Sequence, residues 1–134
     1  NDANPKWWDA KRETDFKGSS AEEFKSRYVD LINNLKNLKS KPQIILTTPL
    51  PIFSERAPAK YKENVIGRKK NFEEQIVPMI KKIAKEQNLP LVDIQKLLAG
   101  DEKLSTDGVH FNNIGYTKMS AVLAERIKEL ANKK

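Results

Sequence analysis

The sequence has 134 residues, 38% of them hydrophobic and 32% charged, and it contains no cysteine. This length fits one domain with a single core, and the lack of cysteine excludes disulfide scaffolds, thiolate zinc sites and thiol nucleophiles. Lysine and arginine number 25 against 18 aspartate and glutamate, a net charge of +7, which raises nucleic acid or another polyanion as a partner. Because both signs are mixed along the helical patterns, solvated helix faces are the favoured interpretation, and nucleic acid is not a favoured partner.

Three stretches in the first half of the chain have distinct patterns. Ser20 and Glu23 form a capping box before apolar residues at helical spacing, which predicts a helix over residues 21–38. A short apolar run predicts a buried strand over residues 42–48. Its aliphatic string is far shorter than the roughly 20 residues that cross a bilayer, so no membrane partner is expected. The proline-containing residues 49–64 are expected to form a long loop, of the kind that builds sites at the carboxyl ends of strands.

The second half predicts a helix, a strand and another helix. Residues 71–87 form a helical pattern that contains Pro78, where the missing N–H predicts a kink. Residues 89–94 are predicted as a second buried strand, residues 100–111 as irregular, and the last helix as starting after an N-cap at Asn112 or the next asparagine. This order is typical of parallel β/α units. Two strands offer too little surface for three amphipathic helices, so further strands are expected from outside this sequence.

One short segment carries the residues with catalytic potential. His110 is the only histidine, and Asp107 precedes it by three residues. A histidine that acts as a general base needs a carboxylate on its second ring nitrogen, to fix the tautomer and stabilise the imidazolium. A loop-capping aspartate beside a surface histidine is the structural alternative. One histidine without cysteine offers no usual metal site, and neither Ser54 nor Ser105 has the context of a nucleophile elbow.

Motifs at both ends of the sequence resemble those of the SGNH hydrolases, also called GDSL esterases. The C-terminal motif of that family is similar to Asp107-Gly108-Val109-His110, with Asn112 and Gly115-Tyr116 after it. The end of its G-x-N-D motif is similar to Asn1-Asp2-Ala3. Its carbohydrate O-acetylesterase-like members resemble this chain at Pro49-Leu50-Pro51 and Val92-Asp93.

The resemblance implies an α/β fold with a flavodoxin-like, three-layer parallel sheet of the SGNH hydrolase type. Residues 1–134 would be the C-terminal half of that single domain, which would account for the missing strands. In the family, a serine nucleophile lies on an N-terminal Gly-Asp-Ser motif, and no such string occurs in this sequence.

The resemblance also implies roles for individual residues. Asp107 would orient His110, and His110 would take the proton from the serine and return it to the leaving alcohol. Asn1 would donate to the oxyanion, a contribution typically worth about 10²–10³ in rate. The candidate substrate contacts are Trp7, Trp8 and Phe53, and one tryptophan of the pair is expected to pack in the core. No metal and no organic cofactor is implied.

The implied function is serine ester hydrolysis, with O-deacetylation of a carbohydrate or another small ester as the reaction. An acylated sugar or small ester would be the substrate. A free amino terminus at Asn1 would be poorly held and would bring charge into the site. The chain is therefore expected to be a fragment or half of a nicked protein, inactive alone and partnered by its N-terminal half. Family members that act on sugars are often exported, which favours a periplasmic or extracellular location.

Two alternatives stay open. A basic, non-catalytic module would bind a polyanion, with an affinity that falls steeply with salt and does not depend on His110. A catalytically dead SGNH-like binding domain would keep the fold and form no adduct with a serine-reactive phosphonate.

Overall fold

The structure is a computed structural model that describes residues 3–5, 8 and 20–132. Its elements, in chain order, are α1 (Ala21–Lys36), β1 (Leu46–Thr47), the 3₁₀-helices η1 (Ser54–Arg56) and η2 (Ala59–Tyr61), α2 (Lys62–Asn71), the π-helix η3 (Phe72–Ile76), α3 (Val77–Glu86), β2 (Leu91–Val92), α4 (Ile94–Leu98), the 3₁₀-helix η4 (Glu102–Leu104) and α5 (Asn113–Ala131). Within the described ranges, no helix is long and apolar enough to cross a membrane.

The two strands pair in parallel, with Leu46 opposite Leu91 and Thr47 opposite Val92. This confirms the predicted parallel order, but each strand is two residues long and shorter than its apolar run. In the part of the chain that the structure describes, β1 and β2 pair only with each other. Regular pairing therefore covers only two residues of each strand, although the apolar residues of the predicted strands continue beyond them.

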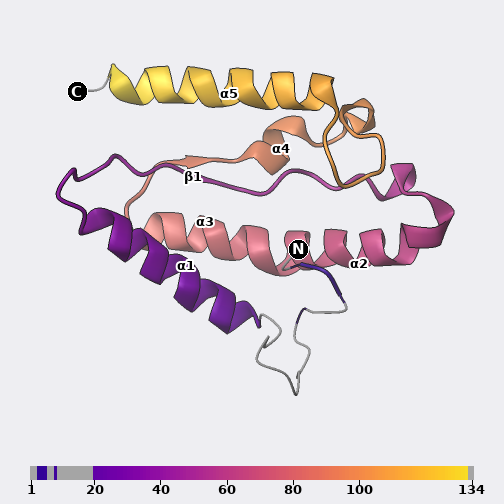
Figure 1. The fold of residues 1–134 in the computed structure, drawn as a ribbon, viewed down its shortest axis with the longest axis horizontal. Coiled ribbons are helices and arrows are strands. Elements are labelled where there is room, and N and C mark those ends of the chain that lie inside the picture. The colour runs from indigo at the N-terminus through magenta and orange to yellow at the C-terminus, as the bar shows by residue number, and fades with distance from the viewer. Residues whose placement is uncertain (1–2, 6–7, 9–19, 133–134) are drawn as a thin grey trace.

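Helices lie on both sides of the strand pair (Figure 1). Leu46 packs with Ile32 of α1 and Ile83 of α3 on one side. On the other side Val92 belongs to the cluster against which Val122 of α5 packs. The alternation of side chains along the strands thus divides the core into two faces, as the period of two requires.

The first helix confirms its predicted start. The Ser20 Oγ accepts from the Glu23 N–H at 3.1 Å, and the Glu23 carboxylate accepts from the Ser20 N–H at 3.3 Å. This capping box fixes the first turn. The helix ends at Lys36, two residues before the predicted end.

A loop was predicted over residues 49–64 and a helix from about residue 71. The predicted boundary between loop and helix is wrong. Helix α2 begins at Lys62, and only Val65 within it is buried, so its sequence shows no apolar face. Before α3 the chain forms a π-helical turn, in which the Val77 N–H reaches the Phe72 carbonyl. Pro78 follows this turn directly, as the second residue of α3.

The last third of the chain contains two short elements that the sequence did not predict, α4 and η4. Asp93 caps α4 by accepting from the Lys96 N–H at 3.2 Å. The final helix starts as expected, because the Asn112 Oδ1 accepts from the Gly115 N–H at 3.0 Å. Between these caps lies the loop that carries Asp107 and His110.

Candidate active site

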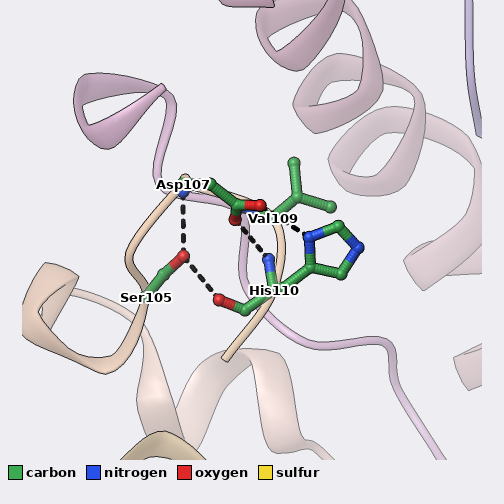
Figure 2. Close-up of polar contacts among 5 residues, drawn as sticks. Ser105, Asp107, Val109 and His110 are labelled. Atoms are coloured by element: carbon green, nitrogen blue, oxygen red, sulfur yellow. Dashed lines mark hydrogen bonds and ion pairs between the residues drawn. The ribbon is translucent and has the colours of Figure 1, made fainter. Parts of the chain in front are cut away.

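A closed loop connects η4 to α5, and Ser105 ties it together. An isolated antiparallel bridge joins Ser105 to Phe111 at its base. Figure 2 shows the Ser105 hydroxyl donating to the His110 carbonyl at 2.8 Å and accepting from the Gly108 N–H at 2.9 Å. Ser105 is 1% exposed, so these bonds are shielded from water. The hydroxyl is therefore a structural tie of the loop and is not open to a substrate.

Gly108 lets this loop lie directly against the chain that follows β1. Its φ is +84°, and a Cβ added there would come within 2.5 Å of the Phe53 carbonyl oxygen. The Gly108 carbonyl also accepts from the Phe53 N–H at 2.9 Å. Both the left-handed conformation and the close backbone contact require glycine.

Asp107 holds both the ring and the backbone of His110. Its Oδ2 lies 2.6 Å from the His110 Nδ1. Its Oδ1 accepts from the backbone N–H of His110 at 2.8 Å and from that of Val109 at 2.9 Å. With Nδ1–H donating to the carboxylate, Nε2 on the far side of the ring is the nitrogen that can accept a proton. The His110 side chain is 75% exposed, so this nitrogen is accessible.

The hydrogen bonds on Asp107 keep its carboxyl ionised. Partial burial raises its pKa, but the bonds from the His110 ring and from the His110 and Val109 N–H groups outweigh burial and lower the pKa to about 2. A carboxylate is therefore present beside the ring over the whole neutral range. It can orient the imidazole and stabilise the imidazolium form.

The start of α5 is packed tightly onto the base of the same loop. Asn112 donates from its backbone to the Leu104 carbonyl at 2.8 Å and from its side chain to the Lys103 carbonyl at 2.7 Å. A Cβ on Gly115 would lie 2.5 Å from the Leu104 carbonyl and 2.7 Å from the Phe111 ring. The family-like residues after His110 thus anchor the loop to the helix.

His110 opens onto a groove of about 290 Å³ between its loop and α2. Asp107, Val109 and His110 form one wall of the groove. The other wall consists of Pro58, Tyr61, Asn64, Val65 and Arg68. No helix was predicted for this second wall, although Tyr61 lies in the loop that was expected to shape a site.

Helix α2 also receives the first described residues of the chain. Asn64 donates from Nδ2 to the Asn4 Oδ1 at 3.0 Å. Asn71 donates from Nδ2 to the Ala3 carbonyl at 3.0 Å. Asn1, the candidate oxyanion donor, lies outside the described residues. The chain two residues after it is nevertheless fixed to the helix that lines the His110 groove.

The aromatic candidates for substrate contact are buried where they are described. Trp8 is 6% exposed, and its indole N–H donates to the Gln75 Oε1 at 2.9 Å. Phe53 is also 6% exposed and stacks on Phe111 with ring centroids 6.4 Å apart. These two rings therefore pack in the core and offer little surface to a substrate. Trp7 lies outside the described residues, and its contact with substrate stays a prediction.

Among residues 3–5, 8 and 20–132, no three His, Cys, Asp or Glu side chains gather closely enough to bind a metal ion.

Comparison with known proteins gives consistent matches. Residues 1–123 match the model of the GDSL-like lipase/acylhydrolase family. The chain is 30% identical to an acetylxylan esterase of Xylanibacter ruminicola over 138 aligned positions, which cover 96% of this chain and 27% of that protein.

Two solved structures share the fold. A lipase/acylhydrolase from Enterococcus faecalis aligns with a TM-score of 0.62 and 24% identity, over 96% of this chain and 57% of that one. A GDSL-like lipase from Bacteroides thetaiotaomicron aligns with a TM-score of 0.66 and 20% identity, over 85% and 55%. The chain thus spans about a quarter of the acetylxylan esterase and just over half of each solved structure.

Proposed function

Because this chain belongs to the GDSL-like lipase/acylhydrolase family, we propose that it supplies the histidine and aspartate of a serine ester hydrolase that deacetylates a carbohydrate or another small ester. The observation that carries the proposal is the 2.6 Å contact between the Asp107 carboxylate and the His110 ring, with the opposite ring nitrogen facing an open groove. The 30% identity to an acetylxylan esterase supports acetylated carbohydrate as the substrate class.

In the proposed mechanism, His110 moves one proton in each half of the reaction: from serine to the leaving sugar oxygen, and then from water to the serine oxygen. Its Nε2 takes the proton of a serine hydroxyl as the serine oxygen bonds to the ester carbonyl carbon, and Asp107 stabilises the imidazolium that forms. The tetrahedral intermediate collapses when the bond to the sugar oxygen breaks, and His110 gives its proton to that oxygen. Water then attacks the acyl-enzyme by the same route and releases acetate and the free serine. Asn1 donates to the oxyanion in both halves. This route requires no metal or organic cofactor.

We also propose that the serine comes from an upstream segment of the same protein, continuous or nicked. That segment would complete a flavodoxin-like, three-layer sheet to which residues 1–134 contribute the C-terminal half. Leu31 on α1 and Ile127 on α5 support this proposal, because they are 53% and 55% exposed on helices that flank the two strands. More strands would cover such apolar surface.

The proposal is tested on the complete protein with His110→Ala and Asp107→Asn, assayed on an acetylated xylo-oligosaccharide and on 4-nitrophenyl acetate. We expect kcat to fall roughly 10⁶-fold for His110→Ala and about 10⁴-fold for Asp107→Asn, the range found for other triads. Asp101→Asn is the matched control, since Asp101 forms a surface ion pair with Lys118 away from the groove. It should leave kcat unchanged.

A serine-reactive phosphonate separates the enzyme from a dead domain of the same fold. The wild-type protein should form one covalent adduct per molecule, located by peptide mapping on a serine outside this sequence. A His110→Ala variant that hydrolyses esters at the wild-type rate would contradict the proposed role of His110 and Asp107. A wild-type protein that forms no adduct would be a binding domain.

A further inference from the structure

Arg68 lies in the same groove as His110, on the wall formed by α2. Its side chain is half-buried, and its Nε donates to the Asn64 Oδ1 at 2.9 Å. Asn64 in turn donates to Asn4 at 3.0 Å. Because its Nε is fixed by this chain of hydrogen bonds, the guanidinium is held in place in the groove before any ligand binds.

The charge of Arg68 has no carboxylate partner in the described part of the chain. The ion pairs formed there connect other residues, and the neighbouring Lys69 lies 3.9 Å from Glu55. Asp107 shares the groove, but both of its oxygens are engaged by His110 and the loop backbone. The hydrogen bond that Arg68 does make, to an uncharged amide, leaves the outer edge of the guanidinium available.

A guanidinium in this position is suited to a planar anion. Its N–H groups match the two oxygens of a carboxylate, and a partly desolvated charge binds such a partner more strongly than an exposed one. The rest of the wall is less polar: Val65 is buried, and Tyr61 is an aromatic residue that is 55% exposed. The volume of about 290 Å³ is at the small end for ligand pockets, enough for one ring-sized group.

We propose that Arg68 binds a carboxylate on the substrate, so that the enzyme prefers acylated anionic molecules to neutral ones. This inference rests on the proposed esterase function and specifies its substrate class. The carboxylate has two possible sources, a uronic acid unit of the sugar or a dicarboxylic acyl group. Both place a carboxylate within one ring-sized group of the ester that His110 serves.

Two matched pairs of esters distinguish these sources in the complete protein. The first pair is the 2-O-acetylated methyl glucuronoside and methyl glucoside, which differ in a carboxylate against a hydroxymethyl group. The second pair is 4-nitrophenyl hemisuccinate and 4-nitrophenyl butyrate. We expect the wild-type kcat/KM to favour the anionic member of one pair at least about tenfold, as a charge-assisted hydrogen bond implies, with most of the difference in KM. The pair that shows the preference identifies the source.

Arg68→Gln should reduce that ratio of anionic to neutral kcat/KM to near one, and Arg68→Lys should retain part of it. Arg27→Gln is the matched control. Arg27 is exposed on α1, so this substitution removes the same charge away from the groove. It should leave the ratio unchanged.

Several results would overturn the inference. A wild-type protein that hydrolyses the neutral esters without preferring either anionic one would refute it, and so would an Arg68→Gln variant that keeps the preference. Equal losses of kcat/KM on both members of a pair in Arg68→Gln would mean that Arg68 has only a structural role. Failure of the wild-type protein to hydrolyse any of the four esters would instead refute the esterase proposal itself.

Discussion

The two walls of the His110 groove are held by different kinds of contact. The loop of residues 105–111 is held mainly by its own neighbours, through bonds of Asp107 and Ser105 that span two to five residues. Helix α2 is joined to the start of the chain through Asn64 and Asn71, across 60 and 68 residues. The Asp107–His110 contact needs only residues close in sequence, although the Phe53 N–H bond to the Gly108 carbonyl places the loop in the fold. The second wall depends on distant contacts throughout. A change in the loop should therefore act on stability, and a change in α2 on alignment of the site.

The sharpest test of the loop is Gly108→Ala in the complete protein, compared with Gly100→Ala. Both glycines have positive φ, +84° and +86°, but an added Cβ meets the Phe53 carbonyl only at Gly108 and nothing within 4 Å at Gly100. We expect Gly100→Ala to cost roughly 1–2 kcal/mol from backbone strain. Gly108→Ala should cost about 1–3 kcal/mol more, because the backbone contact cannot relax easily. Urea unfolding at neutral pH measures both.

Equal destabilisation by the two variants would contradict this view of the loop. It would mean that the chain after β1 yields to the new methyl group, and that the contact between Gly108 and Phe53 does not fix the position of His110.

The local wall is also the part that could be predicted from the sequence. Asp107 and His110 are three residues apart, so one turn brings their side chains together without help from the rest of the fold. The caps at Ser20 and Asn112 are equally local and were predicted correctly. The sequence shows each of these contacts because donor and acceptor are close along the chain.

The second wall could not be predicted, because its contacts join residues that are far apart in the sequence. Helix α2 buries only Val65, so it has no periodic apolar face to detect. Its role depends on the hydrogen bonds of Asn64 and Asn71 to residues near the start of the chain, and no local sequence pattern indicates those bonds. One tryptophan of the pair was expected to pack in the core, but which one, and the burial of Phe53, could not be predicted, because an aromatic side chain suits a core and a binding site equally.

Gly67→Ala tests the distant wall, and a smaller effect on stability is expected. An added Cβ would lie 2.3 Å from the Pro5 Cγ, so the segment of residues 3–5 must shift. Alanine favours the helix over glycine by roughly 1 kcal/mol, which offsets much of the clash. We expect the free energy of unfolding to change by less than about 1 kcal/mol. If Asn1 donates to the oxyanion as proposed, a shift of residues 3–5 should also lower kcat roughly ten- to hundredfold.

Ile66→Ala is the matched control for this variant, because Ile66 is 49% exposed on the same helix. It should leave kcat unchanged. A Gly67→Ala variant with wild-type kcat would show that docking of residues 3–5 on α2 does not align the proposed oxyanion donor Asn1. The two walls would then not differ in their effect on catalysis.

The smallest effect concerns the acid titration of Asp107, which separates the loop's electrostatics from its packing. Its folded pKa of about 2 lies below the ordinary value of about 3.9. The stabilisation from this carboxylate is therefore complete above about pH 4 and is lost as the pH falls through about 2. Because the side chain is 42% exposed, solvent screening keeps that contribution small.

The carboxyl ¹³C shift of Asp107 should show a midpoint near 2, and the loss of activity at acid pH should follow the protonation of another group. A midpoint near 4 would mean that the three hydrogen bonds do not hold the carboxylate in solution, and the local wall would then owe its order to Ser105 and Gly108 alone.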